Sequence, residues 1–199
     1  MPRDEEQKLI ARARRGHADA YRALVEAYKD RLYAFVSRTV RNHHEAEDIC
    51  QAAFVKAYES LNSYSEEYAF STWLFTIAYR LCLNHVRKRK ALSGEVDFSN
   101  VRRTEPDAPQ VLASTEEVRR LRRTIWSAVE QLSLPQRSAV LLFYREGKSC
   151  EDIGRVLGTP TVTVKSHLHR ARAKLRKLLS AELVDDWVAL QALGDAHWA

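Results

Sequence analysis

Glycine and proline are scarce in this sequence of 199 residues, with six and five copies respectively. Such scarcity disfavours collagen-like, low-complexity and turn-rich chains. No long segment alternates apolar and polar residues with the period of two that half-buried strands show. An apolar run of about 18 residues, which a membrane-spanning helix needs, is also missing. The sequence therefore predicts an all-α protein that is not inserted in a membrane.

Cysteine is equally rare, and Cys50, Cys82 and Cys150 lie far apart. They form no Cys-x-x-Cys pair and show no Cys/His spacing of a metal site, so we expect neither a metal nor a cofactor. Each cysteine lies among apolar residues at helical spacing, which favours buried packing. The amino-terminal segment is highly charged and lacks the apolar stretch of a signal peptide, so the expected location is a reducing cytoplasm.

The sequence contains no glycine-rich phosphate loop, no metal-ligand spacing and no nucleophile elbow. Its seven histidines and scattered carboxylates form no placed set, so we expect no catalytic residue and no enzyme. Basic residues outnumber acidic ones by 32 to 26, which gives a net charge of +6. A basic chain of this size often binds a polyanion, most commonly nucleic acid.

Apolar residues recur at the helical period in three segments of the first half, at about 17–40, 44–61 and 71–90. Three such helices can enclose a core, and we assign residues 1–92 to a first domain. The apolar faces predicted for the second and third helices comprise Ala46, Ile49, Cys50, Ala53, Phe54, Ala57, Tyr58 and Leu61, and Trp73, Leu74, Ile77, Ala78, Leu81 and Cys82.

Residues 93–115 contain two prolines and a glycine and show no sustained period, which predicts a flexible linker between two small helical domains. The stretch 93–117 carries six acidic and two basic residues, so this part of a basic protein is net acidic. The tail 181–199 carries four acidic residues and no Lys or Arg, and its spacing suggests one short amphipathic helix.

Residues 116–180 form a second predicted helical domain, in which Pro135 suits the first turn of a helix. Ser149 and Asp152 have the spacing of a capping box, and Gly158 suits the end of the helix that this box begins. Thr159 is predicted to cap the next helix, with Pro160 at its first position. Two helices joined by so tight a turn predict a helix-turn-helix.

The last helix of this domain has a polar, basic face opposite its apolar one. Ten Lys or Arg and only three Asp or Glu occur from Arg137 to Leu179. Recognition helices place their amino-terminal polar residues against base edges, while further positive charges contact phosphates. The predicted face comprises Thr163, Lys165, Ser166, His169, Arg170, Arg172, Lys174, Arg176 and Lys177.

A second basic cluster lies at the end of the third helix, where residues 80–90 contain no acidic residue. Helix-dipole charges alone explain this cluster less well than a nucleic-acid contact does. Aromatic side chains precede it and suit unstacked bases, although core packing explains Phe70 and Trp73 about equally well. The aromatic residues are Tyr64, Tyr68, Phe70 and Trp73.

Three stretches together resemble the extracytoplasmic-function sigma factors, the minimal class of the bacterial sigma-70 family. They are EAEDICQAAFVKAYESL at 45–61, FSTWLFTIAYRLCLNHVRKRK at 70–90 and LPQRSAVLLFYREGKSCEDIGRVLGTPTVTVKSHLHRARAKL at 134–175. The resemblance covers about 18–179, in the order and spacing of the family. It implies a first domain that binds polymerase and melts the promoter −10 element, and a second that binds the −35 element as duplex.

The resemblance also implies roles for individual residues and partners. The partners are core RNA polymerase, promoter DNA and an anti-sigma protein, and the acidic linker would enter the RNA exit path of the polymerase as an RNA mimic. The polymerase-binding positions are Asp48, Gln51 and Phe54. The −10 positions are Phe70, Trp73, Arg80, Asn84, Arg87 and Lys88, and the −35 positions are Lys165, Ser166, His169 and Arg170.

Three positions depart from the family pattern. Ala52 stands where an acidic residue is usual, Arg80 where asparagine is common and His167 where arginine is usual. Two other readings stay open: a stand-alone helix-turn-helix regulator, and an adaptor or anti-sigma protein that binds polymerase without DNA. The first gives no reason for an aromatic and basic third helix, and the two basic faces disfavour the second.

Overall fold

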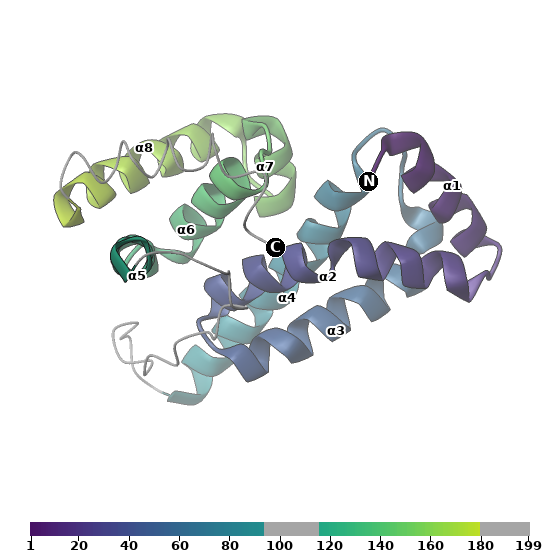
Figure 1. Cartoon of the computed structure of the whole chain (residues 1–199), viewed down its shortest axis with the longest axis horizontal. Coiled ribbons are helices and arrows are strands. Elements are labelled where there is room, and N and C mark those ends of the chain that lie inside the picture. Colours follow the sequence, from purple (N-terminus) through teal and green to yellow (C-terminus); the bar gives the residue numbers. More distant parts are fainter. Residues whose placement is uncertain (94–115, 180–199) are drawn as a thin grey trace. The chain divides into compact units, whose positions relative to one another are not determined.

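The computed structural model describes residues 1–93 and 116–179, and every regular element in those ranges is helical. The predicted all-α architecture is therefore confirmed for these residues (Figure 1). The chain divides into two compact units, residues 1–96 and 97–199. The predicted linker, from residue 94 on, and the predicted tail helix lie outside the described residues.

The described part of the first unit contains four α-helices and one short 3-10 turn, η1. The predicted segments 17–40, 44–61 and 71–90 correspond to α2, α3 and α4, so these three predictions are confirmed. The bounds are α1 Arg3–Arg14, α2 Ala18–Val40, α3 His43–Glu59, η1 Leu61–Ser63 and α4 Phe70–Ser93.

Helices α2, α3 and α4 form the core of the first unit. The inward face of α3 is largely alanine, since Ala46, Ala53 and Ala57 are each 0% exposed. Such small side chains let neighbouring helices approach closely. The large core side chains come from α2 and α4, and the rings of Phe35 and Phe75 lie 5.1 Å apart. Burial raises the pKa of the Cys50 thiol to about 12, with a smaller contribution from Glu47, which agrees with the buried packing predicted for this cysteine.

Helix α1 was not predicted, because its apolar face is narrow and its remaining residues are highly charged. The buried apolar residues of α1 are Ile10 and Ala13 alone. The buried carboxylate of Glu6 accepts a hydrogen bond from the Tyr28 hydroxyl of α2. Arg14 donates to the backbone carbonyls of Leu61 (3.3 Å) and Tyr64, so α1 also holds the segment before α4.

The described part of the second unit contains four α-helices and a single π-helical turn, η2. Pro135 lies in the first turn of α6 as predicted, and the Ser133 N–H donates to Gln136 Oε1 at 3.3 Å. The bounds are α5 Glu116–Glu130, α6 Leu134–Val140, η2 Leu141–Arg145, α7 Cys150–Leu157 and α8 Thr161–Leu178.

Helices α7 and α8 form the predicted helix-turn-helix. The Asp152 N–H donates to Ser149 Oγ at 3.1 Å, and Gly158 ends α7 in the left-handed region with φ of 66°, so Ser149 is confirmed as the N-cap and Gly158 as the C-cap. The predicted Thr159 cap is wrong. Pro160 precedes α8, no side chain caps that helix, and the Pro160 carbonyl accepts from the N–H groups of Thr163 and Val164.

Gly154 permits the close approach of α7 to the turn that follows it. A Cβ atom at this position would lie 2.8 Å from the Thr159 carbonyl oxygen. Since that oxygen belongs to the backbone, the turn itself would have to shift.

We expect Gly154→Ala to lower the free energy of unfolding of the second unit by about 1–3 kcal/mol, the range for overpacking. Denaturant unfolding of the full chain, followed by circular dichroism, measures the effect. Arg170→Ala, at an exposed position of α8, serves as the matched control and should unfold like the wild type. Equal midpoints for Gly154→Ala and wild type would contradict the expected clash.

We expect Tyr28→Phe to lower the free energy of unfolding of the first unit by about 1–3 kcal/mol, because it leaves the buried Glu6 carboxylate without this donor. The double variant Glu6→Leu/Tyr28→Phe removes both polar groups and should recover most of the loss. Unfolding midpoints of the single and double variants test this. A double variant less stable than Tyr28→Phe would show that the pair contributes mainly through packing.

Candidate nucleic-acid interface

The apolar stripe of α8 faces the core of the second unit and so orients the opposite face outward. Side chains of this outward face are exposed at Lys165, His169 and Arg170 and half-buried at Ser166. These four positions, predicted to contact the −35 element, follow one another at helical spacing on one side of the helix. The buried stripe comprises Val164, Leu168, Ala171 and Leu175.

Two basic residues of the predicted α8 face make internal contacts instead. Arg172 Nε donates to the Tyr144 hydroxyl at 2.6 Å, and its guanidinium lies 5.7 Å from the centroid of the Phe143 ring. Lys174 Nζ donates to the Gln131 carbonyl at 2.6 Å, near the end of α5. Both residues therefore contribute to the packing of α8 against its own unit.

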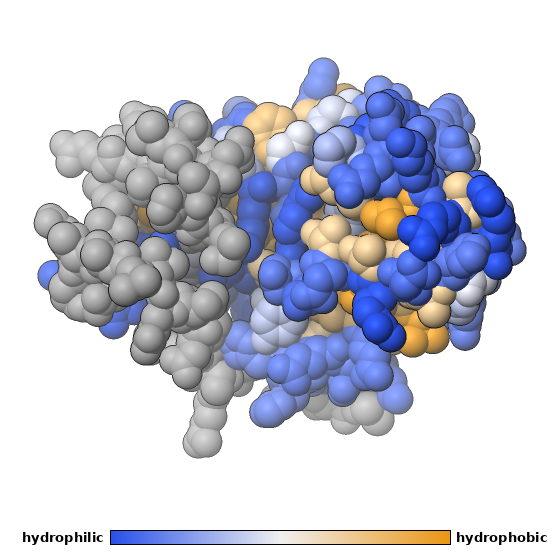
Figure 2. Space-filling model, turned by 45° about the vertical axis from the view of Figure 1, so that its right-hand side comes forward, coloured by the Kyte–Doolittle hydropathy of each residue, from blue (hydrophilic) through white to orange (hydrophobic). Residues whose placement is uncertain are grey.

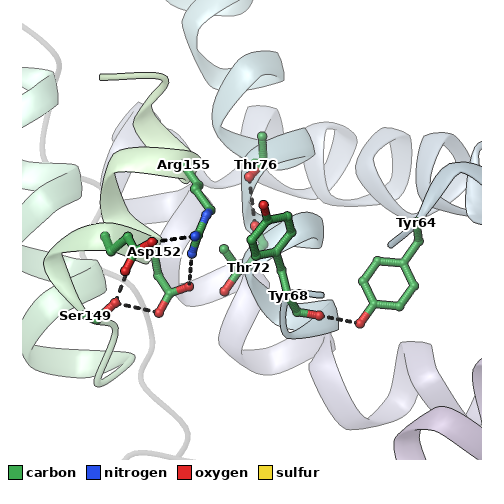
Figure 3. Close-up of polar contacts among 8 residues, drawn as sticks. Tyr64, Tyr68, Thr72, Thr76, Ser149, Asp152 and Arg155 are labelled. Atoms are coloured by element: carbon green, nitrogen blue, oxygen red, sulfur yellow. Dashed lines mark hydrogen bonds and ion pairs between the residues drawn. The ribbon is translucent and has the colours of Figure 1, made fainter. Parts of the chain in front are cut away.

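The amino-terminal turn of α7 is stabilised by a short polar network, drawn in Figure 3. Ser149 Oγ donates to Asp152 Oδ2 at 2.7 Å, in addition to accepting from the Asp152 N–H. Arg155 pairs with Glu151 at 2.6 Å and with Asp152 at 3.4 Å. These contacts hold the helix that carries the close approach at Gly154, and so help to position α8.

His167 lies on the flank of α8, where the family resemblance expected an arginine. Its side chain is half-buried. Burial lowers the pKa of His167 below its usual value of 6.5, and the positive charge of Arg170 lowers it further. The imidazole is therefore mainly neutral at pH 7 and offers no fixed positive charge to a phosphate.

The basic end of α4 and Trp73 lie along a single helical stripe. Positions 73, 77, 80, 84 and 87 recur at steps of four and three, which keeps them on one side of a continuous helix about 21 Å long. The stripe is half-buried at Trp73 and Ile77 and exposed from Arg80 on. The exposed members that were predicted to contact the −10 element are Arg80, Asn84, Arg87 and Lys88.

Phe70 does not belong to this surface. Its side chain is 1% exposed and packs against Tyr28, Tyr64 and Trp73, with ring centroids 5.5–5.6 Å away. The placement of Phe70 on the −10 face is thus corrected: the ring is a core residue, since an inward helical position and three aromatic neighbours remove it from solvent. Tyr64 is also buried, and its hydroxyl donates to the Tyr68 carbonyl at 2.6 Å (Figure 3).

Part of the basic cluster on α4 lies against an acidic side chain of the same unit. His85 Nε2 lies 2.9 Å and Arg89 Nη1 3.7 Å from the Glu45 carboxylate of α3. His85 and Arg89 are four residues apart and lie on the side of α4 that faces α3. The charges on the Arg80 stripe point elsewhere, because they occupy different helical positions.

The polymerase-binding positions predicted on α3 form an outward face. Asp48 and Gln51 are exposed, as is Ala52, and Phe54 is half-buried. Tyr21 of α2 donates through its hydroxyl to the Phe54 carbonyl at 2.5 Å. Burial raises the pKa of Tyr21 to about 12, with a smaller effect of Tyr58, so the hydroxyl keeps its proton at neutral pH.

Leu178 was predicted to face inward on the last helix but is 39% exposed. Three further exposed apolar residues were missed as surface residues: Val55 is 52%, Tyr58 46% and Val162 73% exposed. Tyr58 was predicted on the buried face of α3, whereas its ring is exposed and packs at a tilt of 58° against the Tyr21 ring, with centroids 4.8 Å apart. The helical spacing of Val55 and Tyr58 from the buried alanines of α3, and of Val162 from the apolar stripe of α8, could have shown that these three side chains lie off the buried faces. Figure 2 shows apolar residues surfacing among mostly hydrophilic ones on one face of the molecule.

Among residues 1–93 and 116–179, no three His, Cys, Asp or Glu side chains gather in a way that could hold a metal ion. Within the same ranges, no helix combines the length and the apolar character that crossing a bilayer requires.

Comparison with known families gives two matches, one in each unit. The model of Sigma-70 region 2 matches residues 24–92, and that of Sigma-70, region 4 matches residues 122–175. The first match contains α3 and the stripe on α4, and the second contains α7 and α8 as far as Leu175.

Whole-length relatives agree with these matches. The chain is 36% identical over 183 residues to the ECF RNA polymerase sigma factor SigW of Bacillus subtilis, which covers 87% of this chain and 96% of that relative. It is 32% identical over 176 residues to the ECF RNA polymerase sigma-E factor of Escherichia coli, covering 84% of this chain and 90% of the relative.

Two solved structures share the fold. The sigma factor RpoE of Bartonella quintana, solved with the anti-sigma factor NepR, aligns with a TM-score of 0.67 at 26% identity, over 81% of this chain and 98% of that one. CnrH, solved with the cytosolic domain of CnrY, aligns with a TM-score of 0.64 at 24% identity, over 89% of this chain and 99% of that one.

We expect Arg170→Ala to raise the pKa of His167 toward its usual value, because the substitution removes a nearby positive charge. A pH titration of the imidazole Cε1–H signals by NMR measures this shift. Lys177→Ala removes a positive charge ten residues after His167 and should leave the pKa of His167 unchanged. If Arg170→Ala leaves it unchanged as well, the lowering comes from burial alone.

Proposed function

Because the chain belongs to the extracytoplasmic-function sigma factors of the sigma-70 family, we propose that it binds core RNA polymerase and directs it to promoters. In this proposal the second unit recognises the −35 element as duplex, and the first unit recognises the −10 element as melted single strand. The single observation that carries it is the presence of two separate surfaces, each rich in unneutralised basic residues, in units that match different regions of the family.

The duplex-binding role rests on the outward face of α8. Lys165 and Arg170 are exposed donors that suit guanine edges or phosphates, while Ser166 and His169 suit adaptable polar contacts. The helix is anchored by its apolar stripe, by Arg172 and by Lys174, so its outward side chains start from a fixed backbone. Such preorganisation reduces the entropy lost on binding.

The single-strand role rests on the stripe along α4. A half-buried indole at Trp73 stands at one end, and Arg80, Asn84, Arg87 and Lys88 continue the surface. An aromatic ring can stack on an unpaired base while the basic residues follow the phosphate backbone. The longer side chain and fixed charge of Arg80, where the family often has asparagine, would favour contact with the backbone over readout of a base.

The polymerase-binding role rests on the exposed face of α3. Asp48 and Gln51 provide polar contacts, and Phe54, with the exposed neighbours Val55 and Tyr58, provides an apolar centre. Interfaces combine buried aromatic anchors with a polar rim in this way. Ala52 would leave one polar contact unmade on this face.

Regulation by an anti-sigma protein is part of the same proposal. One structure that shares this fold, RpoE of Bartonella quintana, was solved with the anti-sigma factor NepR. The chain would act in the cytoplasm and without inserting in a membrane, and the partner would compete for the surfaces that polymerase needs.

Run-off transcription tests the initiation role. Purified protein is mixed with bacterial core polymerase free of any sigma factor, on fragmented genomic DNA of the source organism. We expect discrete transcripts that depend on the protein, and comigration of the protein with core polymerase on a sizing column. If an active core gives no transcripts and the protein does not comigrate with it, the proposal is overturned and a stand-alone helix-turn-helix regulator is favoured.

Substitutions separate the two DNA surfaces. Lys165→Ala or Arg170→Ala should weaken holoenzyme binding to duplex promoter by about 1–3 kcal/mol where the residue makes a bidentate base contact. Trp73→Ala should leave duplex binding unchanged and slow promoter opening, measured by permanganate reactivity of unpaired thymines. Unfolding midpoints serve as the control, and changes in stability without any change in transcription would contradict the assigned surfaces.

A further inference from the structure

Val162 is an apolar side chain at the centre of a polar and basic face. It is 73% exposed, more than any other large apolar residue in the described ranges. It lies in the first turn of α8, the longer helix of the helix-turn-helix. Valine is a poorer helix former than alanine. Because the side chain is exposed, burial within its own unit does not offset this lower helix propensity.

The helical geometry places Val162 among the residues proposed to meet the duplex. At about 100° per residue, it lies roughly 150° away from the mean direction of the buried stripe. The surrounding positions at i+3, i+4, i+7 and i+8 fall within about 80° on either side of it. These are Lys165, Ser166, His169 and Arg170, three of them exposed and Ser166 half-buried.

Only one base edge in the major groove offers an apolar group. Thymine presents its C5-methyl group there, whereas the other three bases present polar atoms. Phosphates and sugars give a small branched alkyl group no comparable partner. An apolar side chain at the amino-terminal end of a groove-binding helix therefore matches thymine.

We propose that Val162 is a specificity-determining residue that contacts the C5-methyl group of a thymine in the upstream promoter element. This inference rests on the proposed function, since it requires α8 to lie in the major groove. The contact gives sequence preference without a positive charge, so it should not change the salt dependence of binding.

The test compares thymine with deoxyuridine, which lacks only the methyl group. Holoenzyme made from the full chain and core polymerase first selects duplex fragments from a library randomised across the upstream element. Each thymine of the selected sequence is then replaced by deoxyuridine, one position at a time. Binding is measured for the wild type, for Val162→Ala and for the control Leu178→Ala, which removes an exposed apolar side chain 16 residues further along α8.

We expect one thymine at which deoxyuridine weakens wild-type binding about fourfold, the effect of one buried methyl group. Val162→Ala, which shortens the apolar side chain, should reduce that difference, and Leu178→Ala should keep it fourfold. Salt dependence should match the wild type in both variants. Since position 162 is exposed, the unfolding midpoint of Val162→Ala should also equal that of the wild type.

Two outcomes overturn the inference alone: a selected sequence at which deoxyuridine has no effect anywhere, or an equal deoxyuridine effect in wild type and Val162→Ala. Failure of the proposed function has a different signature. In that case the holoenzyme selects no upstream sequence, and the inference falls with the function on which it rests.

Discussion

The second unit depends on the burial of one apolar stripe on α8. Because that stripe faces the core, the rotation of the helix about its axis is determined, and so is the set of side chains that reaches solvent. The distance between α7 and the turn that leads into α8 is determined by Gly154, because no side chain separates the α7 backbone from the Thr159 carbonyl. The buried apolar residues therefore determine which side chains of α8 form the proposed DNA-binding surface, and the basic residues lie on the side that this burial leaves exposed.

In the first unit, stability and the candidate interface share residues. Trp73 packs on Tyr64 and Phe70 and still presents part of its indole to solvent. A base that stacks on this ring would meet a platform held by the aromatic cluster beneath it. Glu45 has a related role at the other end of α4, where it pairs with the inward basic residues and leaves the outward ones available.

Periodicity was enough to predict α2, α3, α4 and the helix-turn-helix, since each has a broad apolar face and recognisable end signals. It was not enough for α1, whose buried apolar face contains two residues, or for Thr159, where a backbone carbonyl replaces a side-chain cap. Aromatic residues near the edge of a face were the other source of error. Phe70 and Tyr58 are too large for helical angle alone to determine their exposure, which depends on the neighbouring helix.

The alanine face of α3 also has an evolutionary consequence. Positions 46, 53 and 57 have no room for a larger side chain because each is fully buried between helices. Mutational drift along α3 is therefore confined to its outer side, where substitutions leave the fold intact. A lineage could therefore change the chemistry of that outer side, the face proposed to bind polymerase, while keeping one scaffold.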